Sequence, residues 1–205
     1  RDPLWSRGLG DVYKRQDYYR VNDDFESIVG LSQIMQAEAI RFAVEAHRRN
    51  MPYCMGTLYW QFNDCWPVIS WSSIDYGGNW KALHYAARKF FSPILVSIRD
   101  LNDKIEIHVI NDQHHEVISE IRLGLFNLNG DILFKDSFEI NVEPFSSTIY
   151  RTFDKNDFLG GIDLSATVFR AELFVGGKGL SRAHQFFRRP KYLSIPLPKF
   201  DYKIA

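Results

Sequence analysis

Aromatic and polar side chains crowd into one short stretch of the chain, GTLYWQFNDCWP at residues 56–67. A tryptophan offers a flat face, and such a face stacks on the apolar C–H surface of a pyranose ring. Side-chain amides and carboxylates complement sugar hydroxyls, which both donate and accept hydrogen bonds. The stretch therefore predicts carbohydrate recognition. Its substrate-binding candidates are Trp60, Gln61, Asn63, Asp64 and Trp66.

Several of these candidates have a structural alternative. A single tryptophan is more often a core residue, but the polar residues around Trp60 favour a binding role for it. Asp64 either binds a sugar hydroxyl or holds its own loop in place. Trp66 and Trp71 either border one side of the sugar-binding site or pack against a rim, and packing is the favoured interpretation.

Two helices and a strand must position this stretch. Apolar residues recur at steps of three and four through residues 31–49, which predicts an amphipathic helix that Pro52 stops. A strand follows at about 56–62. A second helix is expected at 79–91, with Asn79 as its N-cap. Helix, buried strand, long loop and helix is the order found in an α/β barrel.

The candidate residues lie where a barrel places its functional groups. In such barrels these groups collect at the C-terminal ends of the strands, and Trp60 occupies that place in the predicted strand. Side chains alternate along a strand, so Gln61 and Asn63 are expected to face away from Trp60 unless the strand end is kinked.

The pattern changes after Pro93 to short segments in which apolar and polar residues alternate. Turn signals such as Asn129-Gly130 and GGKG at 176–179 separate them. Six or seven strands at this spacing predict an immunoglobulin-like β-sandwich. The expected strands are residues 94–99, 104–110, 117–128, 132–142, 147–153 and 167–175.

Two terminal segments are expected to lie outside these units. Residues 1–16 have no periodicity and no apolar core of a signal peptide, and they are interpreted as a leader that is not native. Prolines at 190, 196 and 198 predict a linker into a further β-domain. The expected division is 1–16 leader, 17–93 barrel, 94–184 sandwich, and 185–205 linker with the start of the next domain.

Net charge and hydropathy indicate which kinds of partner the chain is expected to bind. Twenty-five basic and 25 acidic residues give a formal net charge of zero, so neither nucleic acid nor a membrane surface is predicted as a partner. No apolar run is long enough for a transmembrane helix. Cys54 and Cys65 flank the predicted strand and would lie roughly 20 Å apart or more, too far for a disulfide.

No metal or cofactor is predicted. The cysteines lack the spacing of a metal site, and the adjacent pair His114-His115 is poorly spaced for chelation. His84 lies within the second predicted helix and is interpreted as a structural histidine rather than a catalytic one.

Residues 56–93, GTLYWQFNDCWPVISWSSIDYGGNWKALHYAARKFFSP, resemble the eighth strand and eighth helix of the catalytic barrel in β-mannosidases of glycoside hydrolase family 2. The segment LSQIMQAEAIRFAVEAHRR resembles the helix before that strand. The resemblance is strong over residues 25–95. It implies an α/β plus all-β fold: the last strand and helices of a (β/α)8 barrel, followed by an immunoglobulin-like sandwich.

The resemblance implies an exo-acting retaining hydrolase that removes terminal β-linked mannose from glycans. Trp60 matches the strand-eight tryptophan that floors the sugar subsite. The family's two catalytic glutamates lie on earlier strands, so none of the present residues is expected to be catalytic, and the chain alone is expected to be inactive. The expected partners are a β-mannoside substrate and the remainder of the barrel.

Two alternatives stay open. One is a family-2 hydrolase with another sugar preference, such as a β-galactosidase or an exo-glucosaminidase. The other is a non-catalytic carbohydrate-binding or adhesion module built on the sandwich. Residues 31–92 separate these classes, because a free-standing sandwich has no need of them.

Overall fold

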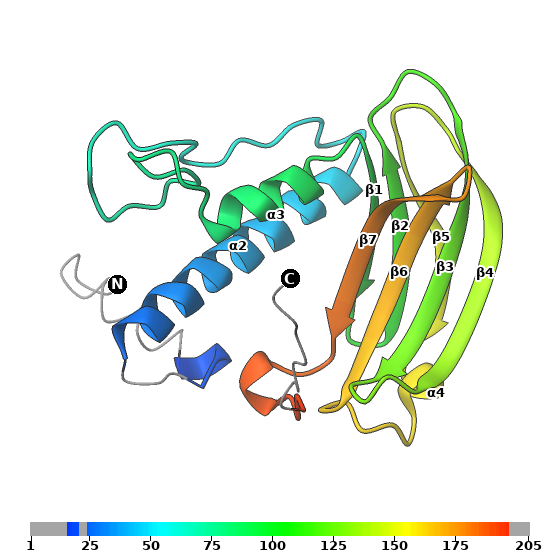
Figure 1. Cartoon of the computed structure of the whole chain (residues 1–205). Coiled ribbons are helices and arrows are strands. Elements are labelled where there is room, and N and C mark those ends of the chain that lie inside the picture. The colour runs from blue at the N-terminus through cyan, green and yellow to red at the C-terminus, as the bar shows by residue number, and fades with distance from the viewer. Residues whose placement is uncertain (1–15, 21–23, 197–205) are drawn as a thin grey trace, which may run out of the picture.

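A helical part and a β-sandwich make up the chain in the computed structural model, which describes residues 16–20 and 24–196 (Figure 1). The helical part holds two long helices joined by an extended loop that projects away from the sandwich (Figure 1). The helices are α2 (Phe25–Arg49) and α3 (Ala82–Phe90), with the short α4 (Lys155–Leu159) and a 3-10 turn, η2 (Pro190–Tyr192), in and after the sandwich. The strands are β1 (Ile94–Asp100), β2 (Lys104–Asn111), β3 (Val117–Asn127), β4 (Ile132–Val142), β5 (Ser146–Asp154), β6 (Thr167–Val175) and β7 (Lys178–Phe186).

Helix α2 begins six residues before the predicted start. The Asp24 carboxylate accepts a hydrogen bond from the Ser27 N–H at 2.8 Å, which caps the first turn. The predicted apolar face is not the one that packs. Phe42, on the predicted face, is 70% exposed, whereas Ala37 and Val44, on another face, are buried against α3. The predicted face consists of Ile28, Leu31, Met35, Ala39, Phe42 and Ala46. The sequence shows that α2 has two apolar faces, but it does not show which one α3 covers.

Helix α3 begins at Ala82, and the predicted N-cap at Asn79 is wrong. The backbone N–H and the side-chain amide of Asn79 both bind the Asp75 carboxylate, within a tight turn before the helix. A side chain of α2 caps α3 instead: Gln33 Oε1 accepts from the Ala82 N–H at 3.1 Å. Apolar spacing in this helix also predicts a buried stripe of Leu83, Ala86, Ala87 and Phe90. Leu83, Ala87 and Phe90 are buried against α2, whereas Ala86 is only partly buried.

The predicted strand at 56–62 does not form in the described chain. Residues 56–62 join neither sheet. A parallel strand needs neighbouring strands on which to form its hydrogen bonds. Past its end, Asn63 and Ile74 form an isolated bridge, and Ile74 forms a second with Trp80.

Two antiparallel sheets form the sandwich. One sheet has the order β1-β2-β5 and the other β4-β3-β6-β7. All six predicted strands are confirmed to within a residue or two, and a hairpin with Gly176 and Gly177 at positive φ adds β7. Strand β7 continues to Phe186, two residues beyond the expected end of the sandwich at 184. Residues 1–15 and 197–205, with most of the predicted leader and the start of the predicted next domain, lie outside the described residues.

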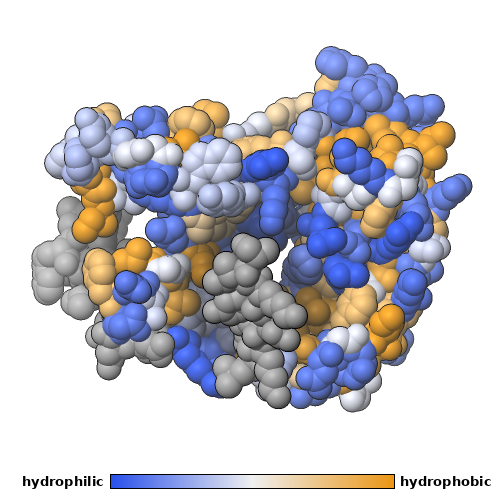
Figure 2. Space-filling model, in the orientation of Figure 1, coloured by the Kyte–Doolittle hydropathy of each residue, from blue (hydrophilic) through white to orange (hydrophobic). Residues whose placement is uncertain are grey.

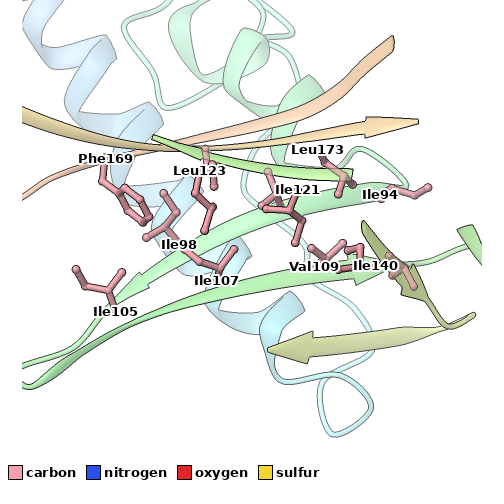
Figure 3. Close-up of a cluster of buried hydrophobic side chains, with 14 of the residues drawn as sticks. Ile94, Ile98, Ile105, Ile107, Val109, Ile121, Leu123, Ile140, Phe169 and Leu173 are labelled. Atoms are coloured by element: carbon pink, nitrogen blue, oxygen red, sulfur yellow. The ribbon is translucent and has the colours of Figure 1, made fainter. Parts of the chain in front are cut away.

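Side chains from both sheets converge in the core between them (Figure 3). Strand β6 shows the alternation that makes this possible, since Phe169, Ala171 and Leu173 are fully buried and their neighbours are not. A fully buried phenylalanine or leucine side chain, such as Phe169 or Leu173, stabilises the fold by about 1.5–3 kcal/mol. Phe169 also meets an aromatic cluster of Phe134, Phe153 and Phe158 at one end of the core.

Buried charged side chains join the helical part to the sandwich. Arg48 donates to the Phe90 carbonyl at 2.5 Å and to the Asp112 carboxylate at 2.7 Å. Ser97 on β1 accepts from Arg49 and donates to Glu45, each at 2.6 Å. The last two turns of α2 are thus tied both to α3 and to the first sheet.

Candidate functional site

Trp60 lies on the face of its segment that is turned away from the helices. The adjacent Tyr59 packs against the α2–α3 cluster, and its ring stacks on Phe91 with centroids 6.2 Å apart. On the opposite face, Leu58 and Trp60 are 99% and 74% exposed. Phe62 is 59% exposed, and its ring meets His84 of α3 edge-on with centroids 5.5 Å apart. Trp60 is therefore not a core residue of the described chain, and the alternation expected of a strand holds here.

Backbone hydrogen bonds fix the end of this segment to the loop that follows. The Ser73 N–H donates to the carbonyls of Gln61 and Phe62, and the Ile74 N–H donates to Phe62 at 2.9 Å. The Asp64 N–H returns a bond to the Ile74 carbonyl at 3.1 Å. The loop therefore folds back beside residues 61–64. The peptide bond between Trp60 and Gln61 is cis.

The Asp64 carboxylate is buried at the centre of this loop. Ser70 Oγ donates to one of its oxygens at 2.5 Å, and Ser72 Oγ donates to the other at 2.8 Å. Lys81 Nζ lies 3.4 Å from the second oxygen. The hydrogen bond from Ser70, joined by those of Ser72 and Lys81, lowers the pKa of Asp64 below its ordinary value. These contacts favour the loop-holding alternative for Asp64.

A pocket of about 240 Å³ opens beside Asp64. Three of the five predicted binding residues line it, namely Gln61, Asp64 and Trp66. Trp60 and Asn63 lie outside its lining, and Asn63 instead shares hydrogen bonds with its neighbours along the chain. The full lining is Gln61, Asp64, Cys65, Trp66, Val68, Ile69, Ser70 and Trp71.

Sequence reasoning missed the serines and the lysine around Asp64. Ser70, Ser72 and Lys81 were not among the candidates, although each binds the one carboxylate at this edge of the loop. A usable signal was present. The run SWSS places hydroxyls on both sides of Trp71, and Lys81 is the first basic residue after it.

His84 has structural contacts on two sides. Its Nδ1 lies 3.2 Å from Ser73 Oγ, and its ring meets the Trp80 ring edge-on with centroids 4.3 Å apart. Ser73 Oγ also donates to the Phe62 carbonyl at 2.7 Å and lies 2.9 Å from the Tyr59 hydroxyl. The histidine thus holds α3 against the end of residues 56–62.

Neither cysteine forms a disulfide, as predicted: Cys54 is partly buried and Cys65 is exposed. Across residues 16–20 and 24–196, no three His, Cys, Asp or Glu side chains come together as metal ligands would. Within the same ranges no helix has both the length and the hydropathy to cross a bilayer.

Comparisons with known proteins bear on both parts of the chain. Residues 103–192 match the model of the mannosidase Ig/CBM-like domain. The chain is 38% identical to the beta-mannosidase of Capra hircus over 108 residues, which are 48% of the chain and 12% of that protein. It is 31% identical to beta-mannosidase A of Aspergillus oryzae over 169 residues, which are 74% of the chain and 18% of that protein.

Solved structures extend the likeness across the helical part. The beta-D-mannosidase of Dictyoglomus thermophilum matches 93% of the chain and 23% of its own length, with a TM-score of 0.86 and 27% identity. An exo-chitosanase of Amycolatopsis orientalis matches 80% of the chain and 20% of its own, with a TM-score of 0.68 and 22% identity, a likeness of fold alone.

The chain thus spans less than a quarter of the length of each of these proteins. The matched domain, the relatives named above and the match in structure agree with one another. Together these findings support a fragment of a beta-mannosidase of glycoside hydrolase family 2.

Proposed function

We propose that an enzyme containing this chain is an exo-acting retaining β-mannosidase, and that the end of residues 56–66 forms part of its sugar-binding site. The observation that carries the proposal is the exposed indole of Trp60, held on a fixed segment within the helical part of a beta-mannosidase fragment. An exposed indole on a rigid support suits stacking on a pyranose ring.

We further propose that residues 17–93 are the last strand and helices of a (β/α)8 barrel. Both helices cover one face of residues 56–62 through Tyr59, which is how helices cover a barrel strand. The other face, with Leu58 and Trp60, would then point into the barrel. The proposed sandwich domain runs from residue 94 to the end of β7 at Phe186, and the proposed linker and start of the next domain follow it.

Within the proposed site, Trp60 stacks on the sugar. Gln61 and Asn63 present amides to its hydroxyls, and Trp66 borders the leaving-group side, where it shares a pocket with Gln61. None of these groups can act as the nucleophile or the acid/base of a retaining glycosidase, which needs two carboxylates about 5 Å apart. We place both catalytic glutamates outside this chain, upstream of it.

The carboxylates near Trp60 support this division of roles. Residues 60–81 contain two, Asp64 and Asp75. Asp64 is surrounded by Ser70, Ser72 and Lys81, and Asp75 is bound by the amide of Asn79. Hydrogen bonds lower the pKa of both, so neither is suited to donate a proton to a leaving group near neutral pH.

A substrate panel tests the proposal. The full-length enzyme is assayed with nitrophenyl β-mannoside, β-galactoside and β-glucosaminide, and kcat/KM is compared. We expect kcat/KM for the mannoside to exceed the others by at least about tenfold, which corresponds to about 1.4 kcal/mol of transition-state discrimination. A preference for glucosaminide or galactoside would replace the proposal with the first alternative. Binding of glycan without hydrolysis would favour the non-catalytic module.

A further inference from the structure

One carboxylate ties together both tryptophan-bearing segments of the loop beside Trp60. Asp64 lies two residues before Trp66, and its two partners Ser70 and Ser72 lie on either side of Trp71. Because both serine side chains bind this one carboxylate, the positions of both tryptophans follow from one buried centre. The side chain of Asp64 is 1% exposed.

Lys81 extends this centre to α3. Its ammonium donates to Ser72 Oγ at 2.7 Å and to the Ser70 carbonyl at 3.4 Å, besides its contact with Asp64. Lys81 is also the residue directly before α3, and its backbone N–H donates to the Ser73 carbonyl at 2.9 Å. The cation thus balances the carboxylate and joins the start of α3 to the loop.

Helix α2 holds the same loop from outside. Gln36 Nε2 donates to the Trp71 carbonyl at 2.7 Å. The segment with Trp71 is therefore fixed by Gln36 on one side and by Ser70 and Ser72 on the other. The pocket between Gln61, Trp66 and Trp71 is bounded by residues held in this way.

The contacts leave Asp64 little capacity to bind a sugar. Both carboxylate oxygens already accept hydrogen bonds, and the side chain is almost wholly inaccessible. We infer that Asp64 and Lys81 are positioning residues that fix the wall formed by Trp66 and Trp71 next to Trp60. This inference rests on the proposed function, since it assigns the wall to the leaving-group side of the same site.

A double-mutant cycle in the full-length enzyme tests it. Asp64→Asn presents an amide N–H₂ to groups that are themselves donors, and Lys81→Met removes the balancing cation. We expect each single variant to lower kcat/KM for a β-mannoside about tenfold, mainly by raising KM. We expect kcat/KM of the double variant to lie no more than about threefold below that of the more active single variant, because both changes disrupt one centre.

Two matched variants control the cycle. Asp75→Asn changes the other carboxylate of the loop, whose partner is Asn79, and it should alter KM less than twofold. Ser70→Ala removes one hydrogen bond to Asp64 and keeps the charges, so it should raise KM about threefold with kcat nearly unchanged. It also provides a milder test if Asp64→Asn fails to fold.

Hydrogen exchange gives a readout that does not depend on activity. In the full-length protein, amides 64–74 should exchange faster in Asp64→Asn and Lys81→Met than in the wild type or in Asp75→Asn. Additive losses near a hundredfold in the double variant would mean that Asp64 and Lys81 act independently, which would overturn the inference. Lower melting temperatures with unchanged KM, or unchanged exchange in residues 64–74, would also overturn the inference. A wild-type enzyme without β-mannosidase activity but with the expected exchange would refute the proposed function and leave the positioning role intact.

Discussion

At the scale of single residues, exposure separates the aromatic side chains of the site from those that pack. Trp60 is 74% exposed on a face that no described helix covers. Trp80 is less exposed, at 43%, and meets the rings of His84 and Tyr85 edge-on, at 4.3 and 5.2 Å between centroids. A ring that packs against its neighbours supports the fold, whereas one that is held exposed is available to a ligand.

His84→Phe should affect stability and leave catalysis unchanged. The new ring keeps the packing against Trp80 and Phe62 but loses the hydrogen bond to Ser73. Ser73 still binds Tyr59 and the Phe62 carbonyl, so no buried group loses all its partners. We expect a cost of about 1 kcal/mol in the free energy of unfolding.

Denaturant unfolding and steady-state kinetics of the full-length enzyme measure this. Tyr59→Phe, which removes the other side-chain partner of Ser73, is the matched control and should behave similarly. A loss of kcat/KM beyond tenfold at normal stability would identify His84 as part of the catalytic machinery.

At the scale of elements, the end of α2 joins three units through Arg48. This arginine is 8% exposed and binds both the Phe90 carbonyl at the end of α3 and Asp112 at the end of β2. Arg48→Met should destabilise the chain by about 2–4 kcal/mol, because Phe90 and Asp112 both lose a charged donor. That corresponds to a fall in melting temperature of about 5–15 °C for a chain of this size.

Arg88→Met is the control for this prediction, since Arg88 is an exposed arginine on α3. Its melting temperature should stay within about 2 °C of the wild type, as for most surface substitutions. Equal melting temperatures for the two variants would mean that the helical part and the sandwich do not depend on Arg48.

Strands with local signals were predictable, and features that depend on distant neighbours were not. Alternation and turn residues located β1 to β6, because those signals lie within each strand. The packing face of α2 was missed because both faces are apolar and only contact with α3 distinguishes them. The cap of α3 comes from Gln33, 49 residues earlier, and no local motif marks it.

The candidate site shows the same division. Trp60 and its polar neighbours stand out in the sequence because unlike residue types are crowded together. The partners of Asp64 lie 6 to 17 residues away, and only the folded loop brings them to it. Residues 56–62 failed to form a strand because a strand depends on its neighbours in a sheet, which no local pattern supplies.

At the scale of the whole molecule, a buried histidine lies at the junction between α2 and the sandwich. His108 Nε2 lies 3.2 Å from the Glu106 carboxylate, and its Nδ1 has no hydrogen-bond partner among the described residues. Burial lowers the pKa of His108, and the nearby cations Arg49 and Arg99 lower it further, against the opposing effect of Glu106. Protonation would place a second buried N–H where no acceptor is present.

This arrangement makes stability depend on pH. Because the folded pKa of His108 lies below its unfolded value of about 6.5, the unfolded chain binds more protons in the interval between them. The contribution of His108 to the free energy of unfolding is therefore fully present above about pH 6.5, and it is lost as the pH falls toward the folded pKa. Glu106 affects stability at lower pH. Its folded pKa is lowered, so its carboxylate contributes stability above about pH 4.5, and this contribution is lost as the pH falls further.

His108→Gln should weaken the pH dependence of stability above about pH 5.5. Between pH 7.5 and 5.5 the melting temperature of the chain should fall less in His108→Gln than in the wild type, because glutamine does not titrate. His115→Gln, in an exposed loop, should keep the wild-type dependence. Identical slopes for all three proteins over this interval would show that His108 does not control the pH response.

The central claim, that Trp60 forms the sugar-binding site of a β-mannosidase, is tested most directly by Trp60→Ala in the full-length enzyme, with thermal melting and kinetics measured together. Aromatic stacking contributes about 1–3 kcal/mol, so kcat/KM for a β-mannoside should fall roughly ten- to hundredfold while the melting temperature stays near that of the wild type. Trp80→Ala, the packed tryptophan, should show the reverse. If Trp60→Ala melts much earlier yet keeps normal kcat/KM below its melting point, Trp60 is a packing residue and the claim is wrong.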